Sequence, residues 1–184
     1  MWPLSRLGGK DKMYIGSDVS LRGDLWNEML EKLKPVINTN YGVYILSVAI
    51  GIYEDQQLEL LPATLPVENY FVIGRPMLHN NSHMLDLLFK AAIITTNLVD
   101  YSEDARMELA FNDESKPDFN RMTFLTKFAN YGLTKLADKL TGDALENIEN
   151  INKFVSECAA GLSFGDLDLD DLDLAEIDLE EKKA

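Results

Sequence analysis

Residues 41–53 read Tyr-Gly-Val-Tyr-Ile-Leu-Ser-Val-Ala-Ile-Gly-Ile-Tyr, and how this stretch folds decides the fold class of the protein. The segment is apolar on every side, as expected for an element that is buried all round. Its β-branched residues favour a buried strand, whereas its length favours a buried helix, and we predict a helix. Four small residues in it would allow a neighbouring helix to approach closely: Gly42, Ser47, Ala49 and Gly51.

Helices are expected on both sides of this stretch. Apolar residues from Leu25 to Leu33 fall at helical spacing, with Asp24 as the expected N-cap and Pro35 as the residue that ends the run. Further helices are expected from about His83 to Val99, from Ser102, its expected N-cap, to Phe111, from Met122 to Leu140 and from Asp143 to about Gly161. The helix at 83–99 is expected to bury Leu85, Leu88, Phe89, Ala92 and Ile93.

The last two of these helices have the most detailed patterns. Apolar or small residues at steps of three or four mark the core side of the first: Met122, Leu125, Ala129, Gly132, Leu136 and Leu140. Asp143 and Glu146 form a pair like a capping box at the start of the second. That helix is expected to bury Ile148, Ile151, Val155, Cys158 and Ala159.

The segment 54–82 leaves room for only a small β element. Pro62, Pro66 and Pro76 exclude a long helix there. Residues 58–61 and 70–73 are expected to pair as short strands. The sequence therefore predicts a mainly α fold, a compact helical domain of about six helices with at most a small β-hairpin. We place this domain at 13–162, between a flexible leader at 1–12 and a disordered acidic tail at 163–184.

Composition excludes several classes of protein. The 184 residues include 31 acidic and 17 basic side chains, for a net charge of −14, and hold one cysteine and two histidines. One cysteine cannot form an internal disulfide, which favours a reducing, cytoplasmic setting. So few cysteines and histidines argue against a structural zinc site. No apolar run is long enough to span a membrane, and no membrane role is expected.

The C-terminal segment repeats an acidic–apolar pattern every five residues. The repeat residues are Asp166, Leu167, Asp168, Leu169, Asp171, Leu172, Asp173, Leu174, Glu176, Ile177, Asp178 and Leu179. Such alternation suits a segment that becomes ordered on a partner with basic and apolar groups, so these residues are our candidate partner-binding tail. The alternative is a tail that only keeps the protein soluble.

One helix face could track a phosphate backbone. Lys127, Tyr131, Lys135 and Lys139 are spaced by four and eight residues in the helix at 122–140, and they are the candidate nucleic-acid contacts. A solvated helix face is the plainer interpretation. A third is that this stripe receives the acidic tail of the same chain. The large negative charge disfavours broad nucleic-acid binding, so any contact with nucleic acid is expected to be indirect.

No residue set predicts a reaction. His79, His83 and Asp86 have a spacing that could hold a metal, but 80–82 resemble a helix start, and we expect ordinary polar residues there. Cys158 is expected to be buried and inert. Asp100, Glu103 and Asp104 fit the acids that favour a helix N-terminus. No motif for phosphate, dinucleotide or nucleophilic chemistry occurs, and we expect no cofactor and no metal site.

Three stretches together resemble a known family. They are Val43-Tyr44-Ile45-Leu46-Ser47-Val48-Ala49-Ile50-Gly51-Ile52-Tyr53 followed by Leu60-Leu61-Pro62, then Leu85-Asp86-Leu87-Leu88-Phe89-Lys90-Ala91-Ala92, and Phe128-Ala129-Asn130-Tyr131-Gly132-Leu133-Thr134-Lys135-Leu136. The chain over about 42–140 resembles the small accessory proteins of bacterial DNA-phosphorothioation (dnd-type) modification and restriction islands. The resemblance implies a cytoplasmic bacterial protein that works beside larger DNA-handling or defence proteins, and it supplies no catalytic residue.

We therefore expect a non-catalytic accessory subunit of a DNA-modification or anti-phage defence assembly. It would bind a larger protein partner through its helical surface and its acidic tail. The first alternative is a DNA-binding or regulatory subunit that uses the lysine stripe. Two others are an acidic inhibitor that mimics nucleic acid and an enzyme of unrecognised type.

Overall fold

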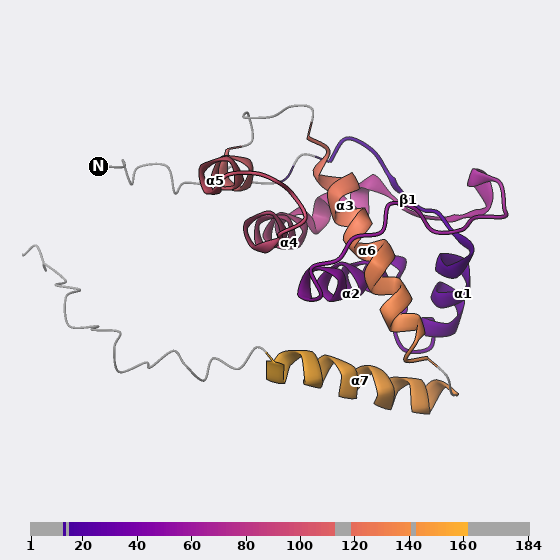
Figure 1. Cartoon of the computed structure of the whole chain (residues 1–184). Helices are drawn as coiled ribbons and strands as arrows, with labels where there is room; N and C mark the ends of the chain where they lie inside the picture. The colour runs from indigo at the N-terminus through magenta and orange to yellow at the C-terminus, as the bar shows by residue number, and fades with distance from the viewer. Residues whose placement is uncertain (1–12, 14, 113–118, 141–142, 162–184) are drawn as a thin grey trace, which may run out of the picture.

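A computed structural model describes residues 13, 15–112, 119–140 and 143–161 of the chain (Figure 1). In this part, seven α-helices and one two-stranded antiparallel sheet confirm the mainly helical prediction. The elements in order are β1 (Val19–Leu21), α1 (Asp24–Leu33), α2 (Asn40–Tyr53), a 3-10 turn (Val67–Asn69), β2 (Phe71–Ile73), α3 (Arg75–Asn80), α4 (Ser82–Thr95), α5 (Glu103–Phe111), α6 (Arg121–Ala137) and α7 (Ala144–Gly161). The predicted leader at 1–12 and tail at 163–184 lie outside the described residues.

The crossing of α2 and α6 forms the centre of the structure (Figure 1). The predicted helix at 41–53 is confirmed as α2. A Cβ atom added at Gly132 would overlap the carbonyl oxygen of Ser47, and one added at Gly51 would overlap the carbonyl oxygen of Phe128. The two backbones therefore touch directly, as the small residues of α2 predicted. The prediction was wrong for two of the four: Ala49 is exposed, and a Cβ atom added at Gly42 would meet Ile37 and Thr39 rather than α6.

Large side chains pack around this crossing. Trp26, Tyr44, Phe89 and Phe128 are fully buried. The indole Nε1 of Trp26 donates to Oδ1 of Asn130 on α6 at 3.0 Å, which satisfies the polar edge of a buried ring. The amide nitrogen of Asn130 donates in turn to the carbonyls of Leu58 and Glu59 at 3.1 and 3.3 Å. This network fastens the segment after α2 against α6.

The sheet is not the one that the sequence predicted. β2 pairs with β1, with Val19 opposite Ile73 and Leu21 opposite Phe71. Residues 58–61, expected as the partner strand, instead run across α6, where the amide of Leu58 donates to the carbonyl of Lys127 at 2.9 Å. The prediction of a strand at 70–73 was correct, but the strand that pairs with it lies far away in the sequence.

Several helix ends also differ from the prediction. The N-cap of α1 is Gly23 rather than Asp24. Asp24 is the first helical residue, and its carboxylate accepts from the amide of Thr64 at 3.0 Å and the hydroxyl of Tyr70 at 3.1 Å. The short helix α3 was not predicted, and Pro76 lies in its first turn, where a missing amide proton costs nothing.

Two predicted caps are confirmed. The hydroxyl of Ser102 accepts from the amide of Ala105 at the start of α5. The carboxylate of Asp143 accepts from the amides of Leu145 and Glu146 at the start of α7, both at 3.0 Å. The expected helix at 83–99 ends earlier, at Thr95.

Helix α7 buries less than predicted. Ile151 is buried, whereas Ile148 and Cys158 are half-buried and Val155 is exposed. The side chain of Ala159 lies outside the described set. Helix α7 contacts the chain just after α6, where the side-chain amide of Asn150 donates to the carbonyl of Lys139 at 3.2 Å. Within the described residues, no helix has both the length and the apolar content needed to cross a membrane.

Candidate functional site

The lysine stripe lies on α6, but all three of its ammonium groups have partners within the molecule. Nζ of Lys127 is 2.6 Å from a carboxylate oxygen of Glu59. Nζ of Lys135 lies 5.4 Å from the ring centre of Tyr131, and Nζ of Lys139 lies 5.1 Å from that of Phe154 on α7. The tail residues 166–179, the other candidate site, lie outside the described residues.

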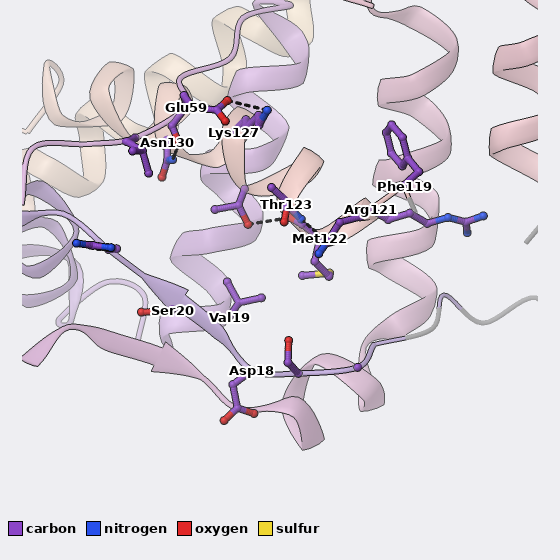
Figure 2. Close-up of a pocket in the computed structure, with 16 residues that line it drawn as sticks. Asp18, Val19, Ser20, Glu59, Phe119, Arg121, Met122, Thr123, Lys127 and Asn130 are labelled. Carbon is purple, nitrogen blue, oxygen red and sulfur yellow. Dashed lines mark hydrogen bonds and ion pairs between the residues drawn. The ribbon is translucent and has the colours of Figure 1, made fainter. Parts of the chain in front are cut away.

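An open groove of about 910 Å³ lies between the segment around β1 and the first half of α6 (Figure 2). It is lined by Gly16, Ser17, Asp18, Val19, Ser20, Arg22, Glu59, Leu60, Phe119, Asn120, Arg121, Met122, Thr123, Thr126, Lys127 and Asn130. Figure 2 shows Lys127 and Glu59 paired with each other at one edge. Asp18, at the opposite edge, accepts from the amide of Arg75. Several polar side chains of the lining, among them Asp18, Glu59 and Lys127, therefore pair with other groups of the protein.

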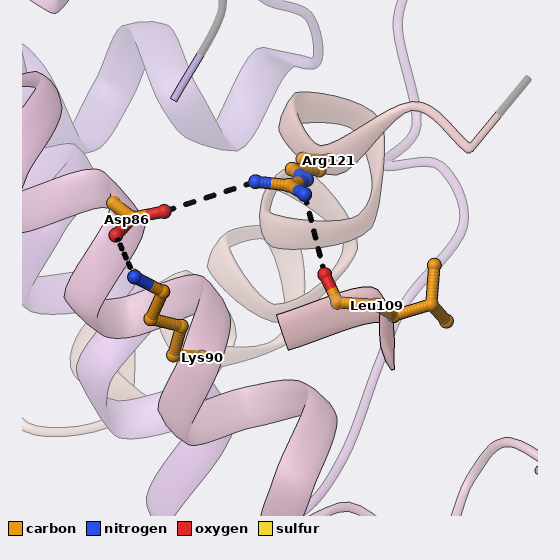
Figure 3. Close-up of polar contacts among 4 residues, drawn as sticks. All are labelled: Asp86, Lys90, Leu109 and Arg121. Carbon is orange, nitrogen blue, oxygen red and sulfur yellow. Dashed lines mark hydrogen bonds and ion pairs between the residues drawn. The ribbon is translucent and has the colours of Figure 1, made fainter. Parts of the chain in front are cut away.

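A buried ionic cluster holds α4, α5 and α6 together (Figure 3). Oδ2 of Asp86 is 2.6 Å from Nζ of Lys90, and Oδ1 is 3.8 Å from a guanidinium nitrogen of Arg121. The other end of that guanidinium donates to the carbonyl of Leu109 on α5 at 3.2 Å, and its plane lies over the ring of Phe89. The cluster is structural, because its charges are paired with one another and its bonds join three helices.

His79, His83 and Asp86, whose spacing alone could have held a metal, do not come together. His79 lies in α3 and His83 at the start of α4, both exposed, while Asp86 is buried with its two basic partners. Across the described ranges, no group of three His, Cys, Asp or Glu side chains is arranged to hold a metal ion.

Two other candidates behave as ordinary residues. Glu103 and Asp104 are exposed in the first turn of α5, where acids favour the helix dipole. Cys158 is half-buried rather than buried. Burial, together with the nearby charges of Glu54 and Glu157, raises the pKa of its thiol, which lowers its reactivity.

Arg106 joins α5 to the end of α4. Its guanidinium donates to the carbonyls of Tyr101 and Val99, each at 3.0 Å, and to that of Thr96. Carbonyls at and beyond a helix C-terminus have no partner within the helix, so one side chain satisfies a whole turn.

Asp55 joins the end of α2 to the same turn. It follows α2 with a left-handed φ of 48°, and its carboxylate accepts from the amide and the side chain of Asn97 at 2.9 and 3.2 Å. Partial burial raises the pKa of Asp55, but hydrogen bonds from Thr96 and Asn97, with the charge of Arg106, outweigh burial and lower it overall.

An apolar surface covers the solvent side of α4 and the adjoining side of α5. We call it the outer face, and it consists of Met84, Leu87, Ala91, Ile94, Met107 and Phe111. Leu87 is 54% exposed and Phe111 60% exposed, although both belong to well-formed helices. Large apolar side chains that gather at one exposed place indicate an interaction surface, whereas single ones are ordinary.

Contacts between α4 and α5 place the two helices of the outer face side by side. Arg106, in the middle of α5, reaches the end of α4, and Phe111, at the end of α5, lies over Nζ of Lys90 in the middle of α4. The helices therefore run antiparallel. Leu87 and Ile94 lie three residues before and four residues after Lys90 on α4, so Phe111 continues the apolar surface of that helix.

Sequence reasoning missed the outer face. It assigned one apolar side of α4 to the core, and the structure buries Leu85, Phe89, Ala92 and Ile93 and half-buries Leu88. A second apolar stripe was present at steps of three and four, in Met84, Leu87, Ala91 and Ile94. A helix that is apolar on two sides needs two neighbours, and this was the available signal.

In comparisons with known proteins, no family model, curated protein or solved structure matches the chain.

Proposed function

We propose that the protein is a non-catalytic interaction subunit that binds a protein partner through the outer face. The observation that carries this proposal is the outer face itself, where five large apolar side chains, each at least 40% exposed, surround Ala91 on two adjoining helices. Their burial would be favourable at about 25 cal/mol per Å² of apolar area removed from water. Core packing does not explain why the outer side of α4 is apolar, because the opposite side of the helix packs into the core.

Other roles have less support. DNA binding through the lysine stripe would compete with the carboxylate of Glu59 for Lys127, while Lys135 and Lys139 lie over the rings of Tyr131 and Phe154. In the described residues, the outer face has no such contacts to give up.

The resemblance to the small dnd-associated accessory proteins supplies the setting of the proposal. In that setting the subunit works in the bacterial cytoplasm, within a DNA-modification or anti-phage defence assembly. The acidic–apolar residues 166–179 would add a second contact with a larger partner.

The test begins with a photo-crosslinking residue at position 87 and, as a control, at position 145. Leu145 is 67% exposed but lies on α7, away from the outer face. The protein crosslinked from position 87 is purified, and its affinity is measured by calorimetry for the wild type, Leu87→Asp and Leu145→Asp. We expect Leu87→Asp to weaken binding at least about tenfold, because it places a charge in an apolar contact. Equal affinity for all three proteins would overturn the proposal.

A further inference from the structure

The exposed apolar stripe of α4 is symmetric about the level of residue 89 along the helix axis. Met84 and Ile94 lie five residues on either side of that level, and Leu87 and Ala91 lie two residues on either side. All four are on the exposed side of one regular helix of 14 residues, Ser82–Thr95. A stripe with this arrangement can meet a copy of itself that runs in the opposite direction.

Antiparallel pairing would match the side chains by size. Leu87 of one copy would face Ala91 of the second copy, and Met84 would face Ile94. A large residue would meet a small one at the two central positions, which lets the helices approach closely. Met107 and Phe111 of α5 would extend the contact at its sides.

Charge also favours a second copy at this place. The chain carries a net charge of −14, so two copies repel each other over most of their surfaces. The outer residues of α4 include no carboxylate, and Asp86, the acid in that helix, is neutralised inside by Lys90 and Arg121. The outer stripe of α4 therefore brings no acid against its copy, whereas the exposed acids Glu103, Asp104 and Glu108 of α5, which lie beside Met107 and Phe111 on that helix, add repulsion and weaken the contact.

The size of the face sets the expected strength. A helix of 14 residues is about 21 Å long, and a stable specific interface buries about 800 Å² on each partner. One pair of such helices is smaller than that standard. The side chains of α5 are therefore needed, and the association is expected to be weak and dependent on concentration.

We propose that a second copy of this chain occupies the outer face, with two α4 helices packed antiparallel across a two-fold axis at the level of residue 89. This rests on the proposed function, because it names the partner of the same surface.

Sedimentation over a range of concentrations tests the proposal with the full chain. The wild type is expected to shift from one chain mass towards twice that mass as the concentration rises. Leu87→Asp should remain monomeric, and Leu145→Asp should associate like the wild type. Leu87 is 54% exposed, so its substitution should leave the melting temperature of the isolated chain almost unchanged.

An exchange of residues tests the antiparallel arrangement. Leu87→Ala alone leaves a gap opposite Ala91, and Ala91→Leu alone places two leucines against each other, so each should weaken association. The double variant L87A/A91L again places a leucine opposite an alanine, and it should recover most of the wild-type association. If the single and double variants associate with equal affinity, the proposed antiparallel pairing is wrong.

The two proposals fail differently. A wild type that stays monomeric at every concentration, while another protein binds it in a Leu87-dependent way, overturns the second copy and leaves the proposed function intact. If the wild type stays monomeric and Leu87→Asp also leaves its affinity for other proteins unchanged, both proposals are wrong.

Discussion

Helices α2 and α4 have the same length and a similar apolar composition, yet they have different surroundings. Each has 14 residues. In α2 only Ala49 and Tyr53 are exposed, whereas α4 exposes six residues: His83, Met84, Leu87, Ala91, Ile94 and Thr95. The difference lies in the neighbours. α2 and α6 each place a glycine, Gly51 and Gly132, at their crossing, which lets the backbones touch, whereas no described element covers the outer side of α4.

This comparison shows that apolar composition sets what a helix can bury but does not set what covers it. A helix that is covered all round becomes part of the core, and its substitutions affect stability. A helix with one uncovered apolar side keeps that side for binding, and its substitutions there affect association.

The contact between α2 and α6 should be the most sensitive point of the fold. Gly132→Ala places a methyl group into the carbonyl of Ser47, and neither backbone can move without separating the two helices. We expect a loss of about 4 kcal/mol in the free energy of unfolding, measured by urea denaturation.

Ala49→Leu is the matched control, because it adds more atoms to α2 at an exposed position. It should change stability by no more than about 0.5 kcal/mol. A Gly132→Ala protein as stable as this control would show that the crossing is not tightly packed.

The ionic cluster should be the next most sensitive point. Asp86→Ala leaves the positive charges of Lys90 and Arg121 without their carboxylate in a largely buried place. We expect a loss of about 3 kcal/mol, and a partial recovery when Arg121→Met is added, because the second change removes one of the unpaired charges. Urea denaturation of the four proteins in this cycle measures the coupling, and Glu103→Ala, an exposed acid on α5, serves as the control. Additive losses would show that the cluster acts only through packing.

Arg106 tests whether α5 can be loosened without unfolding the core. Arg106→Ala removes the donor that several carbonyls after α4 share, and we expect a loss of about 2 kcal/mol. Hydrogen exchange should become faster in α5 while α2 and α6 stay protected.

Arg106→Lys should recover little, since one ammonium group cannot copy the fork of the guanidinium. The exposed Arg75→Ala is the control. If hydrogen exchange in Arg106→Ala becomes faster in α6 by as much as in α5, then α5 and the crossing of α2 and α6 form one cooperative unit.

The smallest expected effect concerns pH and the junction at Asp55. Its folded-state pKa is lowered, so the unfolded chain takes up the proton first as the pH falls. The stability that this carboxylate supplies is fully present above its unfolded pKa of about 3.9 and is lost as the pH falls through the lower folded value.

Thermal melts at pH 7 and at pH values below 4 should therefore show a steeper acid loss for the wild type than for Asp55→Asn. Glu54→Gln, the exposed neighbour of Asp55, should keep the steeper profile. Identical profiles for the wild type and Asp55→Asn would mean that the junction does not depend on the charge.

Local patterns in the sequence were sufficient for most of the helices. The start of α5 at Ser102 and that of α7 at Asp143 follow from side chains that satisfy nearby amides, which is a local effect. The strand partner of 71–73 could not be predicted, because Val19–Leu21 is separated from it by about fifty residues and has no distinctive pattern. The second stripe of α4 was visible in the sequence, but only the structure shows that nothing in the described residues covers it.

Helical spacing and small residues act over a few turns of one chain, so the amino-acid sequence was enough to predict the mainly helical fold and the close approach of a helix to α2. The packing of the helices was needed to show that the stripe lysines have partners within the molecule, that Asp86 belongs to a core cluster rather than to His79 and His83, and that no described residue covers the outer apolar side of α4. Each of these depends on residues far apart in the chain, and their proximity is a property of the packed helices.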